Sequence, residues 1–169
     1  MVTFQRFLNR IFIFTLCAIL IAAFFYQVVK GEEPCSLCFL QRLGMTGIAM
    51  ALLMNLRFGI QVQHYGLAIL SALLGRIVAL RQINLHICPE IPAFGETVLG
   101  FDLYMWSFFI FTTSLFACAI LLILYGYSKH KEAPLTWNRF DQLALWLILF
   151  ITIGNIINAL LDCNLTSCI

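Results

Sequence analysis

Charged residues are scarce in this sequence: it has 8 acidic and 10 basic side chains among 169 residues, against 62% hydrophobic residues. A soluble domain of this length needs more polar surface, because so many apolar residues could not all be hidden from water. The net charge of +2 comes without a dense basic stripe, so nothing indicates binding to nucleic acid. Repeats and low-complexity tracts are also absent. Length and composition therefore predict one integral membrane domain over residues 1–169.

Long runs with few or no charges occupy most of the chain. They predict five membrane spans, at about 11–29, 38–56, 61–83, 103–128 and 142–161. Each is long enough, at about 1.5 Å per residue, to cross most or all of a ~30 Å apolar layer as a helix. Helices are required because backbone polar groups that face lipid must be satisfied within their own segment. The expected fold is all-α, a polytopic four-helix transmembrane bundle plus a fifth span.

The first run also has basic residues in front of it, as a signal peptide does. It is longer than a usual signal core and no clear cleavage site follows, so we expect it to remain as a span.

Basic residues are divided unequally between the two ends of the predicted spans. If the N-terminus is cytoplasmic, the outer loops hold Lys30 as their one lysine or arginine. The inner side then receives Arg6, Arg10, Arg57, Lys129, Lys131 and Arg139. Because this asymmetry follows the positive-inside tendency, we expect a multi-pass protein with a cytoplasmic N-terminus and an outer C-terminal tail.

Five of the seven cysteines fall on the outer side or at its edge in this orientation, where disulfides can persist. They are Cys35, Cys38, Cys88, Cys163 and Cys168. The other two, Cys17 and Cys118, lie within predicted spans. We expect them to be small packing residues, because buried structural thiols are usually inert.

Cys35 and Cys38 form a Cys-x-x-Cys motif where the second span begins, directly after Pro34. A helix N-terminus favours a thiolate through its dipole and its unpaired N–H groups. Arg42 follows Cys38 by four residues, so a helix is expected to place its guanidinium beside that sulfur, one turn deeper. We interpret Arg42 as a group that stabilises negative charge on Cys38 and on a reduced cofactor, rather than one that snorkels outward.

This pattern favours thiol–disulfide chemistry, and two alternatives stay open. A metal-handling membrane protein could bind a soft ion through the motif together with His86 and Cys88. A membrane assembly protein could carry disulfides that are only structural.

The stretch from Pro34 to Arg42 resembles the Cys-x-x-Cys-x-x-x-Arg signature of the disulfide bond formation protein B family. The order of span, short outer loop, motif, second span, tight turn and third span is similar as well. Arg81-Gln82, followed by the stretch from Leu85 to Pro89, is similar to the family's motif where the third span meets the second outer loop. The resemblance covers roughly residues 11–124.

The resemblance implies a thiol:quinone oxidoreductase of the bacterial inner membrane, with the motif and the C-terminal tail in the periplasm. Such a protein re-oxidises a soluble periplasmic thioredoxin-like thiol oxidase and passes the electrons to ubiquinone or menaquinone. Carried over residue by residue, Cys35 and Cys38 are the redox pair, with Cys38 facing the quinone. Arg42 contacts the quinone head group, and Arg81 and Gln82 lie near the same pocket.

The family carries a second cysteine pair in a long second outer loop, and here the sequence differs. The corresponding loop is short and contains only Cys88. We expect Cys163 and Cys168 in the outer tail to form the second pair, since their spacing can close a small disulfide. Cys88 paired with one tail cysteine is the alternative, as is a structural tail disulfide that leaves Cys88 unused.

Two further polar or aromatic pairs lead to predictions. Tyr104 and Trp106, at the outer end of the fourth span, suit an interfacial aromatic belt. Asn155 and Asn158 share one face of the fifth span, and we expect them to form hydrogen bonds across the bundle.

Overall fold

The computed structural model describes residues 2–30, 36–87, 98–127 and 137–165. These residues form five helices, namely α1 Val2–Lys30, α2 Ser36–Phe58, α3 Val62–Ile87, α4 Leu103–Tyr127 and α5 Arg139–Leu165. Each of the five is long and apolar enough to cross a membrane. Within the described ranges there is no strand beyond an isolated bridge between Val98 and Phe101. The predicted all-α membrane bundle is therefore confirmed.

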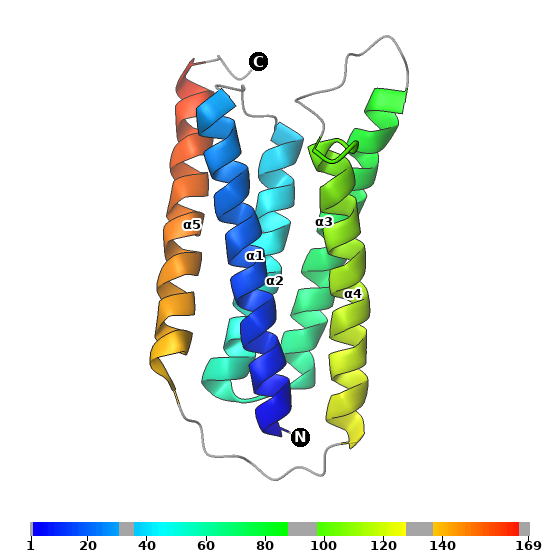
Figure 1. Cartoon of the computed structure of the whole chain (residues 1–169), viewed down its shortest axis with the longest axis vertical. Helices are drawn as coiled ribbons and strands as arrows, with labels where there is room; N and C mark the ends of the chain where they lie inside the picture. The colour runs from blue at the N-terminus through cyan, green and yellow to red at the C-terminus, as the bar shows by residue number, and fades with distance from the viewer. Residues whose placement is uncertain (1, 31–35, 88–97, 128–136, 166–169) are drawn as a thin grey trace.

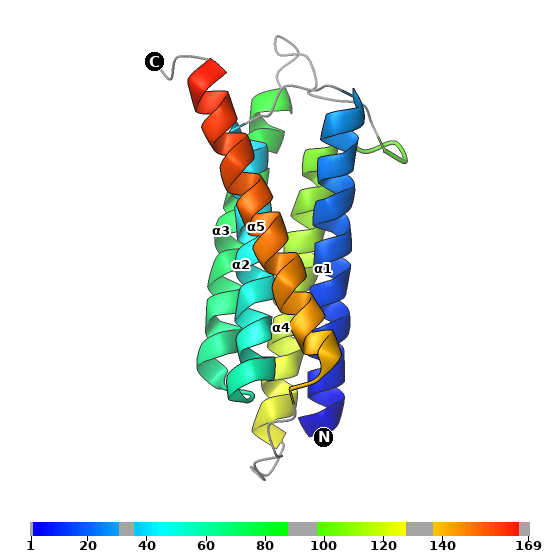
Figure 2. The same cartoon turned by 90° about the vertical axis from the view of Figure 1, so that its left-hand side faces the viewer.

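The helices run side by side, and the N-terminus of the chain lies at the opposite end of the bundle from the end of α5 (Figure 1). The helix α2 packs against α1, α3 and α5, and α3 also packs against α4. The helix α5 crosses obliquely over the face formed by α1 and α2 (Figure 2). As a result, the start of α2 and the end of α5 lie at the same end of the bundle, away from the chain's N-terminus.

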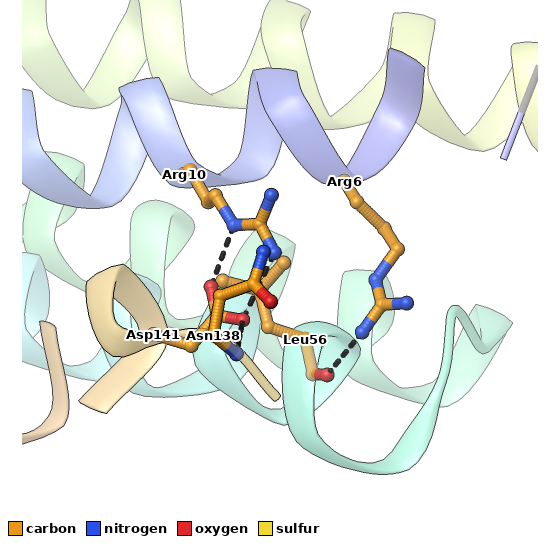
Figure 3. Close-up of polar contacts among 5 residues, drawn as sticks. All are labelled: Arg6, Arg10, Leu56, Asn138 and Asp141. Atoms are coloured by element: carbon orange, nitrogen blue, oxygen red, sulfur yellow. Dashed lines mark hydrogen bonds and ion pairs between the residues drawn. The ribbon is translucent and has the colours of Figure 1, made fainter. Parts of the chain in front are cut away.

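The helix α1 begins at Val2, well before the predicted start of the first span. Its first turns carry polar side chains that find partners on other helices. The Arg6 Nη2 donates to the Leu56 carbonyl oxygen at 2.9 Å, as Figure 3 shows. The Asn9 Nδ2 lies 3.2 Å from the Tyr65 hydroxyl, to which it donates. Because each of these side chains has a hydrogen-bond partner on another helix, α1 can continue through them.

An ion pair joins α1 to the start of α5 (Figure 3). The Arg10 Nε and Nη2 donate to the two carboxylate oxygens of Asp141 at 2.6 and 2.9 Å. Asp141 also accepts a hydrogen bond at 3.1 Å from the backbone N–H of Asn138, directly before α5. The same carboxylate therefore caps α5 and connects it to α1.

Glycines allow α2, α3 and α4 to approach closely. A Cβ added to Gly44 of α2 would lie 3.2 Å from the Cα of Gly75 in α3. A Cβ added to Gly75 would lie 2.2 Å from the buried Phe111 ring of α4. The hydrophobic core of the bundle includes Cys17 and Cys118, which are both buried as the sequence predicts.

One prediction about α5 is wrong. Asn155 is only 2% exposed, yet neither atom of its side-chain amide has a hydrogen-bond partner within the described chain. At this level α5 meets α1 through Gly154 and the Phe24 ring, an apolar contact that offers no donor or acceptor.

Candidate functional site

A cavity of about 630 Å³ lies at the end of the bundle where α2 begins. All five helices contribute to its wall, and so does the turn that contains Val98 and Leu99. The lining is largely apolar, with a small number of polar side chains. Ligand-binding cavities in proteins usually have volumes of about 300–1,000 Å³ and this kind of lining. The cavity is therefore suited to a mostly apolar small molecule.

Cys38 lies in the cavity wall at the end of a chain of two buried amides. The Gln82 Nε2 donates to the Cys38 Sγ at 3.6 Å, and the sulfur also lies 3.9 Å from the Gln82 Oε1. The Gln41 Nε2 donates to that same Oε1 at 2.7 Å. An N–H donor directed at sulfur favours its negatively charged form, whereas the amide oxygen can accept from a thiol. The arrangement can hold the sulfur in either state.

Arg42 also lines the cavity, and its hydrogen bonds run toward α1. Its guanidinium donates to the Gln27 Oε1 at 2.6 Å and to the Ala23 carbonyl oxygen at 3.4 Å. It also lies over the Phe24 ring, 4.7 Å from the ring centroid. The Cys38 sulfur thus contacts Gln82, and Arg42 places a positive charge in the wall of the same cavity.

The structure separates the neighbours Arg81 and Gln82. Gln82 is buried and lines the cavity, whereas Arg81 is exposed and is not among the lining residues. The Gln82 side chain faces the cavity from α3, and the Arg81 side chain points about 100° away from it around the helix axis.

The remaining predicted cysteines fall outside what the structure describes. Cys35, Cys88 and Cys168 lie outside the described residues, and of Cys163 only the helical backbone is described. Within the described ranges, no three His, Cys, Asp or Glu side chains form a group that could hold a metal ion. The metal alternative needs Cys35 and Cys88, which are not in those ranges.

Tyr104 has a different environment from the one expected for a belt residue. It is only 7% exposed, and its hydroxyl donates to the Asp102 Oδ2 at 2.6 Å. Its ring stacks on His86, with 5.0 Å between ring centroids, and it lines the cavity. The prediction of an interfacial belt position is therefore wrong for Tyr104. The cause is the contact with α3, which draws the ring into the bundle.

Sequence reasoning did not assign several other polar residues to the wall, namely Tyr26, Gln27, Gln41, Ser107 and Asn158. Gln27 carried a signal, since it is a polar residue near the end of the uncharged first run. Gln41 stands between Cys38 and Arg42 in the motif. For Asn158 the sequence analysis predicts only hydrogen bonds to other helices.

Comparisons with known proteins agree on one family. The family model described as disulfide bond formation protein DsbB matches residues 5–93. A protein named disulfide bond formation protein B from Azoarcus sp. (strain BH72) is 34% identical over 149 residues, which cover 80% of this chain and 88% of that protein.

Two other proteins of the same name match over shorter stretches. The one from Chromobacterium violaceum is 42% identical over 93 residues, covering 51% of this chain and 54% of its own length. The one from Haemophilus influenzae (strain 86-028NP) is 30% identical over 118 residues, covering 63% of this chain and 65% of its own length. The chain thus spans between about half and two thirds of these two relatives. No solved structure matches it significantly.

Proposed function

The chain belongs to the disulfide bond formation protein B family, and on that premise we propose that it is a membrane thiol:quinone oxidoreductase. Its reductant is a periplasmic thioredoxin-like thiol oxidase in the dithiol form, and its oxidant is ubiquinone or menaquinone. The observation that carries this proposal is the Cys38 sulfur in the wall of a mostly apolar cavity of about 630 Å³. The cavity lies at the end of the bundle that we place on the periplasmic side.

The residues of the cavity fit a quinone. The apolar wall suits the ring and the start of an isoprenoid tail, and the volume is in the range of cofactor sites. The positive charge of Arg42 suits the oxygen atoms of the ring, which gain electron density on reduction. When bound, the quinone supplies a two-electron acceptor, which takes up two electrons and two protons to become a quinol.

The protein's own part begins with thiol–disulfide exchange. A thiolate of the reduced partner attacks a sulfur of the Cys163–Cys168 disulfide, and the partner's second thiol resolves the mixed disulfide. The partner leaves oxidised, and two electrons and two protons now reside on Cys163 and Cys168 as thiols. A second exchange transfers them to Cys35 and Cys38, which restores the tail disulfide. Of this motif pair, the outer Cys35 is the residue that exchanges with other cysteines.

Cys38 is the residue that faces the acceptor. Its sulfur gives up electrons as the Cys35–Cys38 disulfide forms again, and the two thiol protons are released. The Gln82 amide, 3.6 Å from the sulfur, stabilises the thiolate that must form first. The apolar lining excludes water, which strengthens the attraction between that thiolate and the Arg42 guanidinium.

The test is quinone reduction by the purified full chain in detergent, driven by a reduced thioredoxin-like protein and followed by quinone absorbance. The wild type should reduce the quinone, and Cys38→Ala should abolish this. Cys118→Ala removes a buried core cysteine instead and should retain the activity. Retained activity in Cys38→Ala would overturn the proposal. A wild type that holds stoichiometric metal and reduces no quinone would favour the metal alternative.

The same assay assigns the second cysteine pair. Cys163→Ala and Cys168→Ala should each stop the partner-driven reaction, whereas Cys88→Ala should leave it intact. The reverse pattern, with Cys88 essential, would favour the pairing of Cys88 with a tail cysteine.

A further inference from the structure

Most polar side chains of the cavity wall are already engaged. Gln82 contacts Cys38, and Arg42 donates to Gln27. The wall also contains hydrogen bonds from Gln41 to Gln82, from Tyr104 to Asp102, from Trp106 to the Val98 carbonyl and from Ser107 to the Leu103 carbonyl. Tyr26 has an interaction of its own as well. Of the lining residues that the structure describes, Asn158 is the one with a polar side chain and no hydrogen bond.

The helix that carries Asn158 is held firmly in the bundle. Its start is fixed to α1 by the ion pair of Asp141 with Arg10. Along its length it packs against α1 and α2. Its position at the cavity is therefore part of the fold, although the family model match over residues 5–93 ends well before α5.

Asn158 is partly buried, and an amide in a largely apolar wall is stabilised when a molecule in the cavity bonds to it. The side chain of Asn158 offers two N–H donors and one carbonyl acceptor. Its neighbour Asn155, one turn earlier on the same face, is also without a hydrogen bond but is buried and is not in the cavity lining. The two amides thus differ in burial and in access to the cavity.

We propose that Asn158 is a ligand-binding residue of this cavity, whose amide donates a hydrogen bond to a ring oxygen of the bound quinone. The inference deepens the proposed function and rests on it. The helix α5 thus adds one hydrogen-bond donor to a binding site that is otherwise formed by α1 to α4.

The test measures binding directly, without turnover. Menadione, a quinone without a tail, is titrated into the full-length protein in detergent while tryptophan fluorescence is recorded. Trp106 lies in the cavity wall and reports occupancy through quenching. Trp137 and Trp146 are outside the lining and supply background.

Asn158→Leu keeps a side chain of similar size and removes the amide. We expect it to raise the dissociation constant for menadione about threefold to tenfold, the effect of one neutral hydrogen bond. The matched control Asn155→Leu removes the same amide outside the cavity and should leave the constant within about twofold. If Asn158→Leu does not fold, Asn158→Ala is read in the same way.

A second ligand separates hydrogen bonding from packing. The hydrocarbon 2-methylnaphthalene has the ring of menadione without its oxygens, and its affinity follows from competition with menadione. It should bind the wild type and Asn158→Leu equally.

Two results would overturn the inference, and they can be told apart. Saturable menadione binding that is the same in the wild type and Asn158→Leu refutes the role of Asn158 alone. No saturable quenching in the wild type refutes the quinone site itself, and the inference falls with it.

Discussion

The ion pair between Arg10 and Asp141 allows a quantitative prediction about how α5 is held. Asp141→Asn keeps the shape of the side chain and removes its charge, and Arg10→Leu removes the guanidinium and keeps an apolar stem. The double variant completes a thermodynamic cycle that isolates the interaction between the two residues.

The magnitude follows from the burial of the two side chains. Removing one partner of a fully buried pair costs about 3–5 kcal/mol, whereas an exposed pair contributes about 0–1 kcal/mol. Here the Asp141 side chain is 0% exposed and the Arg10 side chain 22%, and the two hydrogen bonds are 2.6 and 2.9 Å long. We therefore expect Arg10→Leu to lower the free energy of unfolding by about 3 kcal/mol, because it leaves a buried carboxylate unpaired. Asp141→Asn should cost about 2 kcal/mol, since the guanidinium retains some access to water.

The assay is unfolding in mixed micelles with increasing sodium dodecyl sulfate, followed by circular dichroism. The interaction energy from the cycle should be about 1.5–2 kcal/mol. Arg57→Leu is the control, because Arg57 is exposed at the same end of the bundle and stacks on the Trp137 ring. It should cost less than about 1 kcal/mol. An interaction energy below about 0.5 kcal/mol would refute the reasoning, since that is the range of a surface pair.

Three other predictions concern the bundle and the cavity. Gly75→Ala should destabilise the fold by about 1–3 kcal/mol in the same titration, because its Cβ would lie 2.2 Å from the Phe111 ring. Adding Phe111→Leu should recover most of that loss, and no recovery would mean that the cost arises elsewhere. Arg42→Met should weaken menadione binding about tenfold, and unchanged quenching would contradict this. Gln82→Leu should slow iodoacetamide alkylation of reduced Cys38 about tenfold, measured by mass spectrometry, and an unchanged rate would exclude thiolate stabilisation by the amide.

The number and type of the helices could be predicted from the sequence, because uncharged runs of this length have few alternatives in a membrane. The start of α1 could not. Arg6 and Asn9 look like residues outside a span, and their partners Leu56 and Tyr65 are far along the chain. Only the assembled bundle shows that these polar groups are satisfied.

The candidate site was predictable where the motif is local. Cys38 and Arg42 both line the cavity, as their spacing on one helix indicates. The orientation of Arg42 toward Gln27 depends on how α1 packs beside α2, which spacing within α2 does not contain. The choice between Arg81 and Gln82 likewise depends on the rotation of α3 about its axis.

The close contact of Gly44 with Gly75 has a consequence for the Cys38 site, although neither glycine touches it. Gly44 lies about one turn beyond Gln41 on the same face of α2, and Gly75 lies about two turns before Gln82 on the same face of α3. Because two backbones meet there without side chains between them, the Gln41 and Gln82 side chains nearer the end of the bundle can bond to each other directly, at 2.7 Å. We expect a methyl group at Gly44, which would lie 3.2 Å from the Gly75 Cα, to widen the gap between α2 and α3 and to separate the two amides. We therefore expect the reactivity of the Cys38 sulfur to depend partly on the absence of side chains at two glycines deeper in the bundle.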